Sequence, residues 1–92
     1  MFVTLQEAKK YLRVDFPDED RLIRHFLTTA KELCMSIARY EDERTFMKEC
    51  REAKIAILYA TGYLYEHREE ADHHALTITL RSLLFGSRKE AF

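Results

Sequence analysis

Glycine and proline are scarce in this chain, whose 92 residues include two Gly and one Pro. Both residue types interrupt helices or mark turns, so their scarcity beside many Ala, Leu, Glu, Lys and Arg predicts an all-α fold. A chain of this length suffices for one modest core, and we expect residues 1–92 to form a single helical domain. We do not expect a catalytic cleft between two lobes.

Long hydrophobic runs are also missing. The stretch Ile55–Tyr65 has eleven residues without a charge, whereas a membrane-spanning helix needs about 20 apolar residues. Charged residues, among them Glu52, Lys54, Glu66 and Arg68, flank the stretch at both ends. Apolar side chains in nearly every direction around a helix are typical of a helix buried on more than one side. We therefore predict that this stretch is the centre of the domain.

Neither sign of charge is in clear excess. Fifteen Lys and Arg against sixteen Asp and Glu give a formal net charge of -1, which does not indicate a nucleic-acid binder, so any DNA contact would need a local basic patch. A helix-turn-helix is not expected, because the best-formed late helix is the most apolar one. Two small basic groups could contact phosphates. They are Arg81, Arg88 and Lys89 near the C-terminus, and Lys9, Lys10 and Arg13 near the N-terminus.

The chain lacks the motifs of common enzymes and metal sites. It has no HExxH, no paired CxxC, no Gly-rich phosphate loop and no Ser-containing elbow, so we expect neither an enzyme nor a bound cofactor. Glu66, His67, Glu70, His73 and His74 fall within nine residues, and His67 and Glu70 share a helix face. This run fits a solvated helix end as well as a metal site.

Two cysteines, Cys34 and Cys50, fall on the apolar faces of predicted helices, and no signal peptide precedes them. We expect reduced, buried thiols with raised pKa values rather than a disulfide or a nucleophile. His25 borders its helix face and is expected at the edge of the core or on the surface.

The first two helices have recognisable starts. Thr4 and Glu7 form a capping-box pattern that predicts a short helix carrying Leu5, Ala8 and Leu12. Pro17 interrupts the helical pattern, and Asp18 is the predicted N-cap of a second helix that runs to about Tyr40. Residues 40–44 lack glycine, so the sequence allows the second and third helices to be either an antiparallel hairpin or one long helix.

The third helix is predicted from about Thr45 to Arg68, roughly 35 Å long at about 1.5 Å per residue. Gly62 within it costs about 1 kcal/mol relative to Ala, which favours a close helix–helix approach there. Residues 76–80 alternate like a strand, but a lone strand has no partner, so we predict a loop and then a short fourth helix that ends at Gly86. The predicted fold is a small all-α bundle of about four helices with a long central third helix.

Aromatic residues exceed what a core of this size needs. They fit either a Tyr-rich core with solvated hydroxyls or a protein–protein interface, where Tyr and Phe are enriched. Phe92 adds to this excess at the C-terminus. The candidate subunit-interface residues are Tyr59, Tyr63, Tyr65, Leu83, Leu84 and Phe85.

Several stretches match, in order along the chain, the motifs of a known family. They are residues 4–15 (TLQEAKKYLRVD), 18–23 (DEDRLI), 56–58 (AIL) with 63–68 (YLYEHR), and 80–84 (LRSLL) followed by Arg88. The set resembles the small helical head–tail connector (adaptor) proteins of tailed bacteriophages and prophages. The family often has Gly or Pro before its third helix and Pro-x-Gly before its last, and this chain has neither.

The resemblance implies a structural subunit of a ring that lies below the portal and extends the DNA channel. It implies as partners other copies of the chain, the portal protein and the next head-completion or tail protein, with nonspecific channel-DNA contact and no membrane. The implied location is the head–tail junction of the virion, and the host cytoplasm before assembly. A small helical interaction module, a dimeric regulator and a DNA-binding regulator remain alternatives.

Overall fold

The computed structural model describes residues 3–70 and 72–84, and every regular element in these ranges is a helix. The predicted all-α class is confirmed, with five helices instead of about four. Their bounds are Leu5–Leu12 (α1), Asp20–Ala38 (α2), Glu43–Glu49 (α3), Ala53–Glu66 (α4) and His73–Leu84 (α5). No helix within the described ranges is both long enough and apolar enough to cross a membrane.

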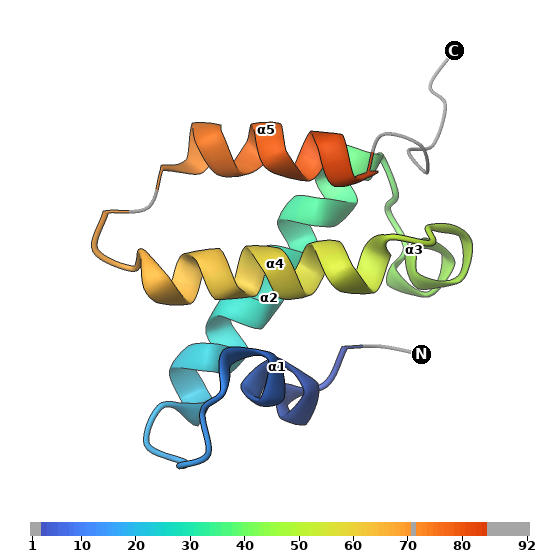
Figure 1. Cartoon of the computed structure of the whole chain (residues 1–92). Coiled ribbons are helices and arrows are strands. Elements are labelled where there is room, and N and C mark those ends of the chain that lie inside the picture. The colour runs from blue at the N-terminus through green and yellow to red at the C-terminus, as the bar shows by residue number, and fades with distance from the viewer. Residues whose placement is uncertain (1–2, 71, 85–92) are drawn as a thin grey trace.

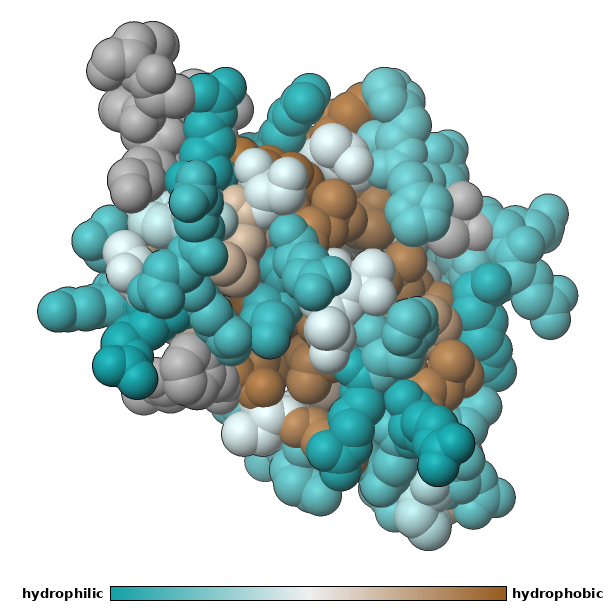
Figure 2. All heavy atoms as spheres, turned by 180° about the vertical axis from the view of Figure 1, so that it is seen from behind, coloured by the Kyte–Doolittle hydropathy of each residue, from teal (hydrophilic) through white to brown (hydrophobic). Residues whose placement is uncertain are grey.

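The helices form two layers around α4 (Figure 1). In the front layer, α4 lies between α5 on one side and α1 on the other, and α5 runs antiparallel to α4. The longest helix, α2, crosses obliquely behind α4 and contacts α1, α4 and α5. From behind, where α2 is nearest, apolar atoms appear in patches among polar side chains (Figure 2). The molecule measures 45 × 29 × 17 Å along its principal axes.

Two apolar clusters hold the helices together. The larger joins α2, α3, α4 and α5 and includes Cys34, Phe46, Ile57 and Leu80. The smaller, built on Ala8, Val14 and Ile23, attaches α1 to α2 and α4. The predicted central stretch is therefore buried on more than one side, because α4 contacts each of the other four helices.

The start of α1 was predicted correctly, and that of α2 was not. Thr4 Oγ1 accepts a hydrogen bond from Glu7 N (3.1 Å), and Thr4 N donates to Glu7 Oε1 (3.0 Å), which completes the capping box. The second helix begins at Asp20 with Glu19 at the N-cap position and no side-chain cap. Asp18 is therefore not the N-cap.

Helices α1 and α2 end in the same way, without glycine. Arg13 (φ 61°) and Arg39 (φ 65°) adopt the left-handed conformation. The residue after each is buried, and its backbone N–H bonds to the carbonyl five residues back, Val14 to Lys9 (3.0 Å) and Tyr40 to Met35 (2.9 Å). This Schellman geometry ends α2 before Tyr40 and excludes one continuous helix through residue 44.

The single third helix predicted over residues 45–68 is wrong. Cys50 adopts an extended conformation (φ -93°, ψ 109°) and separates α3 from α4. Asp42 caps α3 by accepting a hydrogen bond from Thr45 N (2.8 Å). Phe46, on α3, packs against Tyr40, with the two ring centroids 5.4 Å apart. The break lets α3 turn away from the α4 axis and still bury Phe46 and Cys50.

The last helix begins earlier than predicted. Asp72 Oδ1 accepts a hydrogen bond from Ala75 N (3.0 Å), as an N-cap does, and α5 starts at His73. The strand-like residues 76–80 are helical, with Leu76, Leu80 and Leu84 buried on one side. Gly86, the predicted end of this helix, lies outside the described residues.

Candidate subunit interface

One side of helix α4 is only partly covered by the other described helices: Gly62 is buried against α1, whereas Ile55 and Glu66 are exposed. Its buried residues face α2, α1 packs on one flank and α5 on the other. Residues 55, 59, 62 and 66 share the remaining side, because residues three and four apart are neighbours on a helix. Ile55 is 58% exposed and Tyr59 is partly exposed. We call this side, defined by Ile55, Tyr59, Gly62 and Glu66, the open face of α4.

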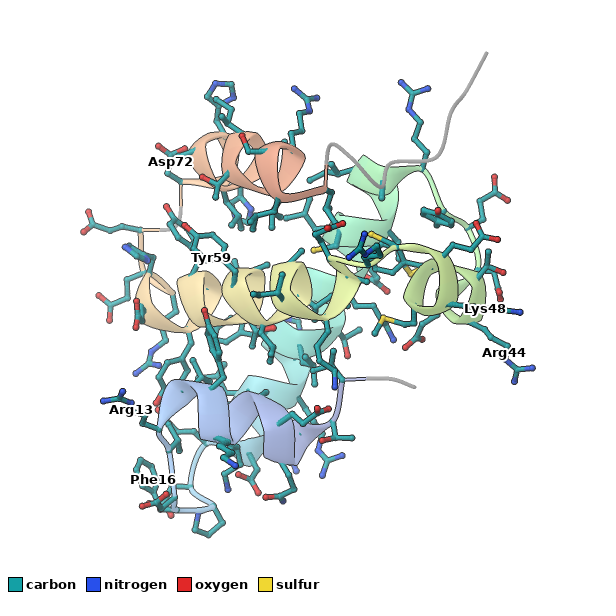
Figure 3. All side chains as sticks on the ribbon, turned by 45° about the vertical axis from the view of Figure 1, so that its right-hand side comes forward. Arg13, Phe16, Arg44, Lys48, Tyr59 and Asp72 are labelled. Atoms are coloured by element: carbon teal, nitrogen blue, oxygen red, sulfur yellow. The ribbon has the colours of Figure 1, made fainter. Side chains whose placement is uncertain are left out.

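Gly62 lies at a hollow in the open face. A Cβ atom placed on Gly62 would lie 3.1 Å from Tyr11 Cε2 and 3.6 Å from Leu12 Cδ2. The predicted close approach at this glycine is thus confirmed, with the end of α1 as the neighbour. The hollow has a volume of about 420 Å³, and its lining includes Tyr11, Arg13, Tyr59, Gly62, Tyr63 and His67. Tyr59 extends from α4 toward α5, and Arg13 points away from the helices (Figure 3).

Tyr63 holds the link between α4 and α5 in place. Its hydroxyl accepts a hydrogen bond from Asp72 N (3.2 Å) and lies 3.4 Å from the Asp72 carbonyl oxygen. The ring of His67 stacks on that of Tyr63, with centroids 4.2 Å apart and an interplanar angle of 18°. Tyr63 therefore has a structural role within one chain.

Tyr65 also makes contacts within the chain. Its hydroxyl donates a hydrogen bond to the Glu19 carboxylate, and this bond together with burial raises the pKa of Tyr65. The Arg68 guanidinium lies 4.8 Å from the ring centroid and 3.5 Å from Glu19 Oε2. Of the three tyrosines, Tyr59 has no hydrogen-bond partner in the part of the chain that the structure describes. It is the one whose hydroxyl is available to another molecule.

The other predicted interface and phosphate-contacting residues divide by burial. Leu84 is completely buried in the larger cluster, so its side chain cannot reach a partner without unfolding, and Leu83 is half-buried. Arg81 is exposed on the last turn of α5. Phe85, Arg88, Lys89 and Phe92 lie outside the described residues.

The candidate metal and thiol groups are separated in space or inaccessible. Glu66, Glu70, His73 and His74 are exposed, and His67 stacks on Tyr63. Among the described residues, no group of three or more His, Cys, Asp or Glu side chains could hold a metal ion.

Cys34 and Cys50 are buried thiols that form no disulfide, as predicted. Burial, and to a smaller extent the neighbouring Cys50, raises the pKa of Cys34 to about 12. His25 is exposed beside Phe26, with ring centroids 5.9 Å apart.

Four large apolar side chains are exposed among the described residues and were not singled out from the sequence as interface residues; one of them, Ile78, is 51% exposed on α5. Tyr11 is 48% exposed at the hollow, Ile55 is exposed on the open face, and Phe16 is 49% exposed in the α1–α2 loop. Ile55 could have been recognised, because it lies opposite the buried Ala53, Ile57 and Ala60 on a helical wheel. Nothing in the sequence distinguishes an exposed Phe16 from a buried one.

Comparison with known proteins agrees with the motifs and the helical fold. The sequence matches the model of the phage gp6-like head–tail connector protein family over residues 2–90. Comparisons with curated proteins and with solved structures gave no match. The family is a structural one, and a match over almost the whole chain makes this protein a component of the phage virion. The chain belongs to the phage gp6-like head–tail connector family.

Proposed function

We propose that the chain is one subunit of a homo-oligomeric ring that lies below the portal and extends the channel through which DNA passes. The observation that carries this proposal is the open face of α4. Ile55 and Tyr59 lie one turn apart on α4, and Ile55 is 58% exposed while Tyr59 is partly exposed at the edge of the larger cluster. Exposed apolar side chains grouped on one face mark protein–protein contact sites.

A ring of identical subunits needs two different patches on each subunit, which meet head to tail. The open face of α4 is one of them in this proposal. The second lies elsewhere on the chain, and the candidate interface residues Leu83, Leu84 and Phe85 place it first in the C-terminal segment. The buried Leu80 and Leu84 leave Leu83 and the residues beyond α5 to make such a contact.

The remaining parts of the proposal concern other molecules. The portal protein and the next head-completion or tail protein would bind the two rims of the ring, after subunits made in the host cytoplasm assemble. Arg81, exposed at the end of α5, would contribute nonspecific phosphate contacts in the channel, because many copies around a duplex add their charges.

The first test is the native mass of the protein over a concentration series, alone and mixed with the portal protein of the same phage. We expect a large discrete oligomer under at least one of these conditions. A sharp two-fold dimer, unchanged by the portal, would instead support a dimeric regulator. A monomer under both conditions would also contradict the proposal.

A double variant tests the open face directly. Ile55→Glu with Tyr59→Glu should abolish the large oligomer and leave the helical circular dichroism spectrum unchanged, because Ile55 is exposed and Tyr59 lies partly exposed at the edge of the larger cluster. Thr28→Glu, at an exposed position on α2, is the matched control and should assemble normally. Tyr63 and Tyr65 are unsuitable for this test, since charged residues there would break contacts within the chain.

A further inference from the structure

The loop between α1 and α2 presents an aromatic side chain to solvent. Phe16 is 49% exposed and precedes Pro17, which is also exposed. Figure 3 shows Phe16 beyond α1, at the end of the molecule away from α5. An exposed Phe at a protruding position loses much water-accessible area when a partner covers it, which makes it a candidate anchor for an interface.

Contacts on both sides hold this loop in place. On one side, Val14 is 8% exposed in the smaller cluster, and its N–H bonds to the Lys9 carbonyl. On the other side, Lys9 Nζ lies 2.7 Å from Asp20 Oδ1, and the Lys9 side chain is 10% exposed. The loop is therefore fixed before any partner binds, which lowers the entropy lost on docking.

The hollow in the open face of α4 has the shape and chemistry to receive such a side chain. Its walls are the rings of Tyr11, Tyr59 and Tyr63, and its floor is Gly62, which has no side chain. Its volume of about 420 Å³ exceeds what one aromatic ring needs. In the same chain, Phe16 does not line this hollow and lies beyond α1 (Figure 3).

The charges next to the two surfaces are complementary. Arg13 lies at the rim of the hollow, exposed and with no ion-pair partner among the described residues. Asp15 and Asp18, on either side of Phe16 and Pro17, are exposed and equally unpaired within the described part of the chain. The hollow lining also contains one acidic residue, Glu66, which α4 contributes, whereas Arg13 lies at the end of α1. Asp15 and Asp18 therefore suit the Arg13 side of the hollow, and Phe16 suits its aromatic walls.

We propose that Phe16 of one subunit inserts into the α4 hollow of a second copy of the chain, with Asp15 and Asp18 facing Arg13 of that copy. This inference rests on the proposed ring function and names the surface that meets the open face. In the proposed ring, Phe16 of each subunit enters the hollow of the next one, which is a heterologous contact; a reciprocal exchange between two copies would instead close a two-fold dimer. The α1–α2 loop thereby takes the place first considered for the C-terminal segment.

Disulfide trapping between two variants, each with one added cysteine, tests whether the loop of one copy contacts the hollow of another. A Phe16→Cys protein is mixed with a Tyr59→Cys protein under mild oxidation, at the concentration and with the portal partner that give the wild-type oligomer. We expect a covalent dimer from this mixture. The matched control pairs Phe16→Cys with Ile78→Cys, because Ile78 is similarly exposed on α5 but far from the hollow lining. Both native cysteines are buried and should not interfere.

A second measurement covers the case in which cysteine at either position weakens assembly. Phe16→Ala should raise the concentration needed for half-maximal assembly by on the order of tenfold or more, as loss of an interface anchor does. Its unfolding midpoint should stay near that of the wild type, because Phe16 is not part of either core cluster.

The outcomes separate this inference from the proposed function. If the wild type assembles, but Phe16→Ala assembles equally well and the control pair cross-links as fast as the test pair, the loop-in-hollow contact is wrong and the ring stands. If the wild type does not assemble alone or with its portal, both proposals fail. Selective cross-linking with weakened assembly of Phe16→Ala supports both.

Discussion

Arg39 holds a backbone conformation that is costly for any residue with a side chain. Its φ of 65° ends α2 and directs Tyr40 into the core. A left-handed residue other than glycine costs about 1–2 kcal/mol. Replacement by glycine removes this cost, but part of the gain is lost because glycine has greater conformational freedom in the unfolded chain.

We therefore expect Arg39→Gly to raise the free energy of unfolding by about 0.5–1 kcal/mol. Urea denaturation followed by circular dichroism measures the change. Arg39→Ala, which removes the same side chain without relieving the backbone, should give no gain. Equal stabilisation by both variants would show that the arginine side chain, and not the backbone, is the source of the cost.

Glu7 links the capping box to α4 through Lys54. Its carboxylate accepts a hydrogen bond from Lys54 Nζ (2.6 Å) and another from Thr4 N, and these bonds lower the pKa of Glu7. A carboxyl group with a lowered pKa in the folded state stabilises the fold above its unfolded pKa. That stability is lost as the pH falls through the folded-state value.

The wild type should accordingly lose stability as the pH drops below about 4. Glu7→Gln keeps a side chain that can complete the capping box but has no charge to titrate, so its stability should change less between pH 6 and pH 3. Urea unfolding at the two pH values compares them. Identical pH dependence in the two proteins would contradict the assigned role of Glu7.

Local signals of this kind explain which helix starts could be predicted. The capping-box pattern of Thr4 and Glu7 can be recognised in the sequence and was predicted correctly. Asp72 carries the same type of signal for α5, but the alternation of residues 76–80 concealed it. The end of α2 was predicted to within two residues, Tyr40 against Ala38. The left-handed conformation of Arg13 and Arg39 was not predicted, because neither residue is Gly or Asn.

At the scale of elements, the hydrophobic pattern predicted the burial of α4 but not the break before it. Phe46, Cys50, Ala53 and Ile57 keep helical spacing through the break, so the pattern fits one continuous helix equally well. Tertiary packing decides the outcome, because turning α3 brings Phe46 against Tyr40. Neither Gly nor Pro marks the turn.

Gly62 lowers the stability of α4, and its lack of a side chain leaves space for the hollow. Gly62→Ala removes a helix-interior cost of about 1 kcal/mol, and the exposed Tyr11 ring needs to shift by only a few tenths of an ångström to admit the methyl group. We expect a net gain of about 0.5 kcal/mol in the free energy of unfolding, together with weaker self-assembly, because the methyl group partly fills the hollow.

Thermal unfolding and native mass measured on the same Gly62→Ala preparation test both effects. Ala60→Gly is not a suitable control because Ala60 is buried in the core. Thr28→Ala, at an exposed position of α2, changes helix propensity away from the hollow and should leave assembly unchanged. Normal assembly of Gly62→Ala would argue against an occupied hollow.

At the scale of the whole molecule, the sequence motifs predicted the family and the fold class. The residues of the proposed interface are identified by the exposure of their side chains, which the hydrophobic periodicity does not give for all of them. Tyr59 remains a candidate, but Tyr63 and Tyr65 make hydrogen bonds within the chain. Helical spacing could have marked Ile55 as exposed. Tyr11 and Phe16 are exposed because of how α1 and the loop after it pack, and their place in the proposed interface could be found from the structure alone.

The alkylation rates of the two thiols show in which order parts of the molecule unfold. Cys34 is completely buried between helices and has a pKa of about 12, so it should resist alkylation at pH 8 until the core opens. Cys50 adjoins the seven-residue α3, which packs mainly on α4, and should react first through local opening. Mass spectrometry of the pulse-labelled protein orders the two sites. Equal rates would show that α3 and the core open together.

The fixed α1–α2 loop has a consequence for the timing of particle construction. With Val14 buried and Lys9 paired to Asp20, the loop has no folding step to complete when two subunits meet. Association of pre-formed surfaces is limited by how often they collide in the right orientation. In the proposed ring, the time of assembly would then be set by the supply of subunits and of the template on which they collect, and not by a slow conformational change within the subunit.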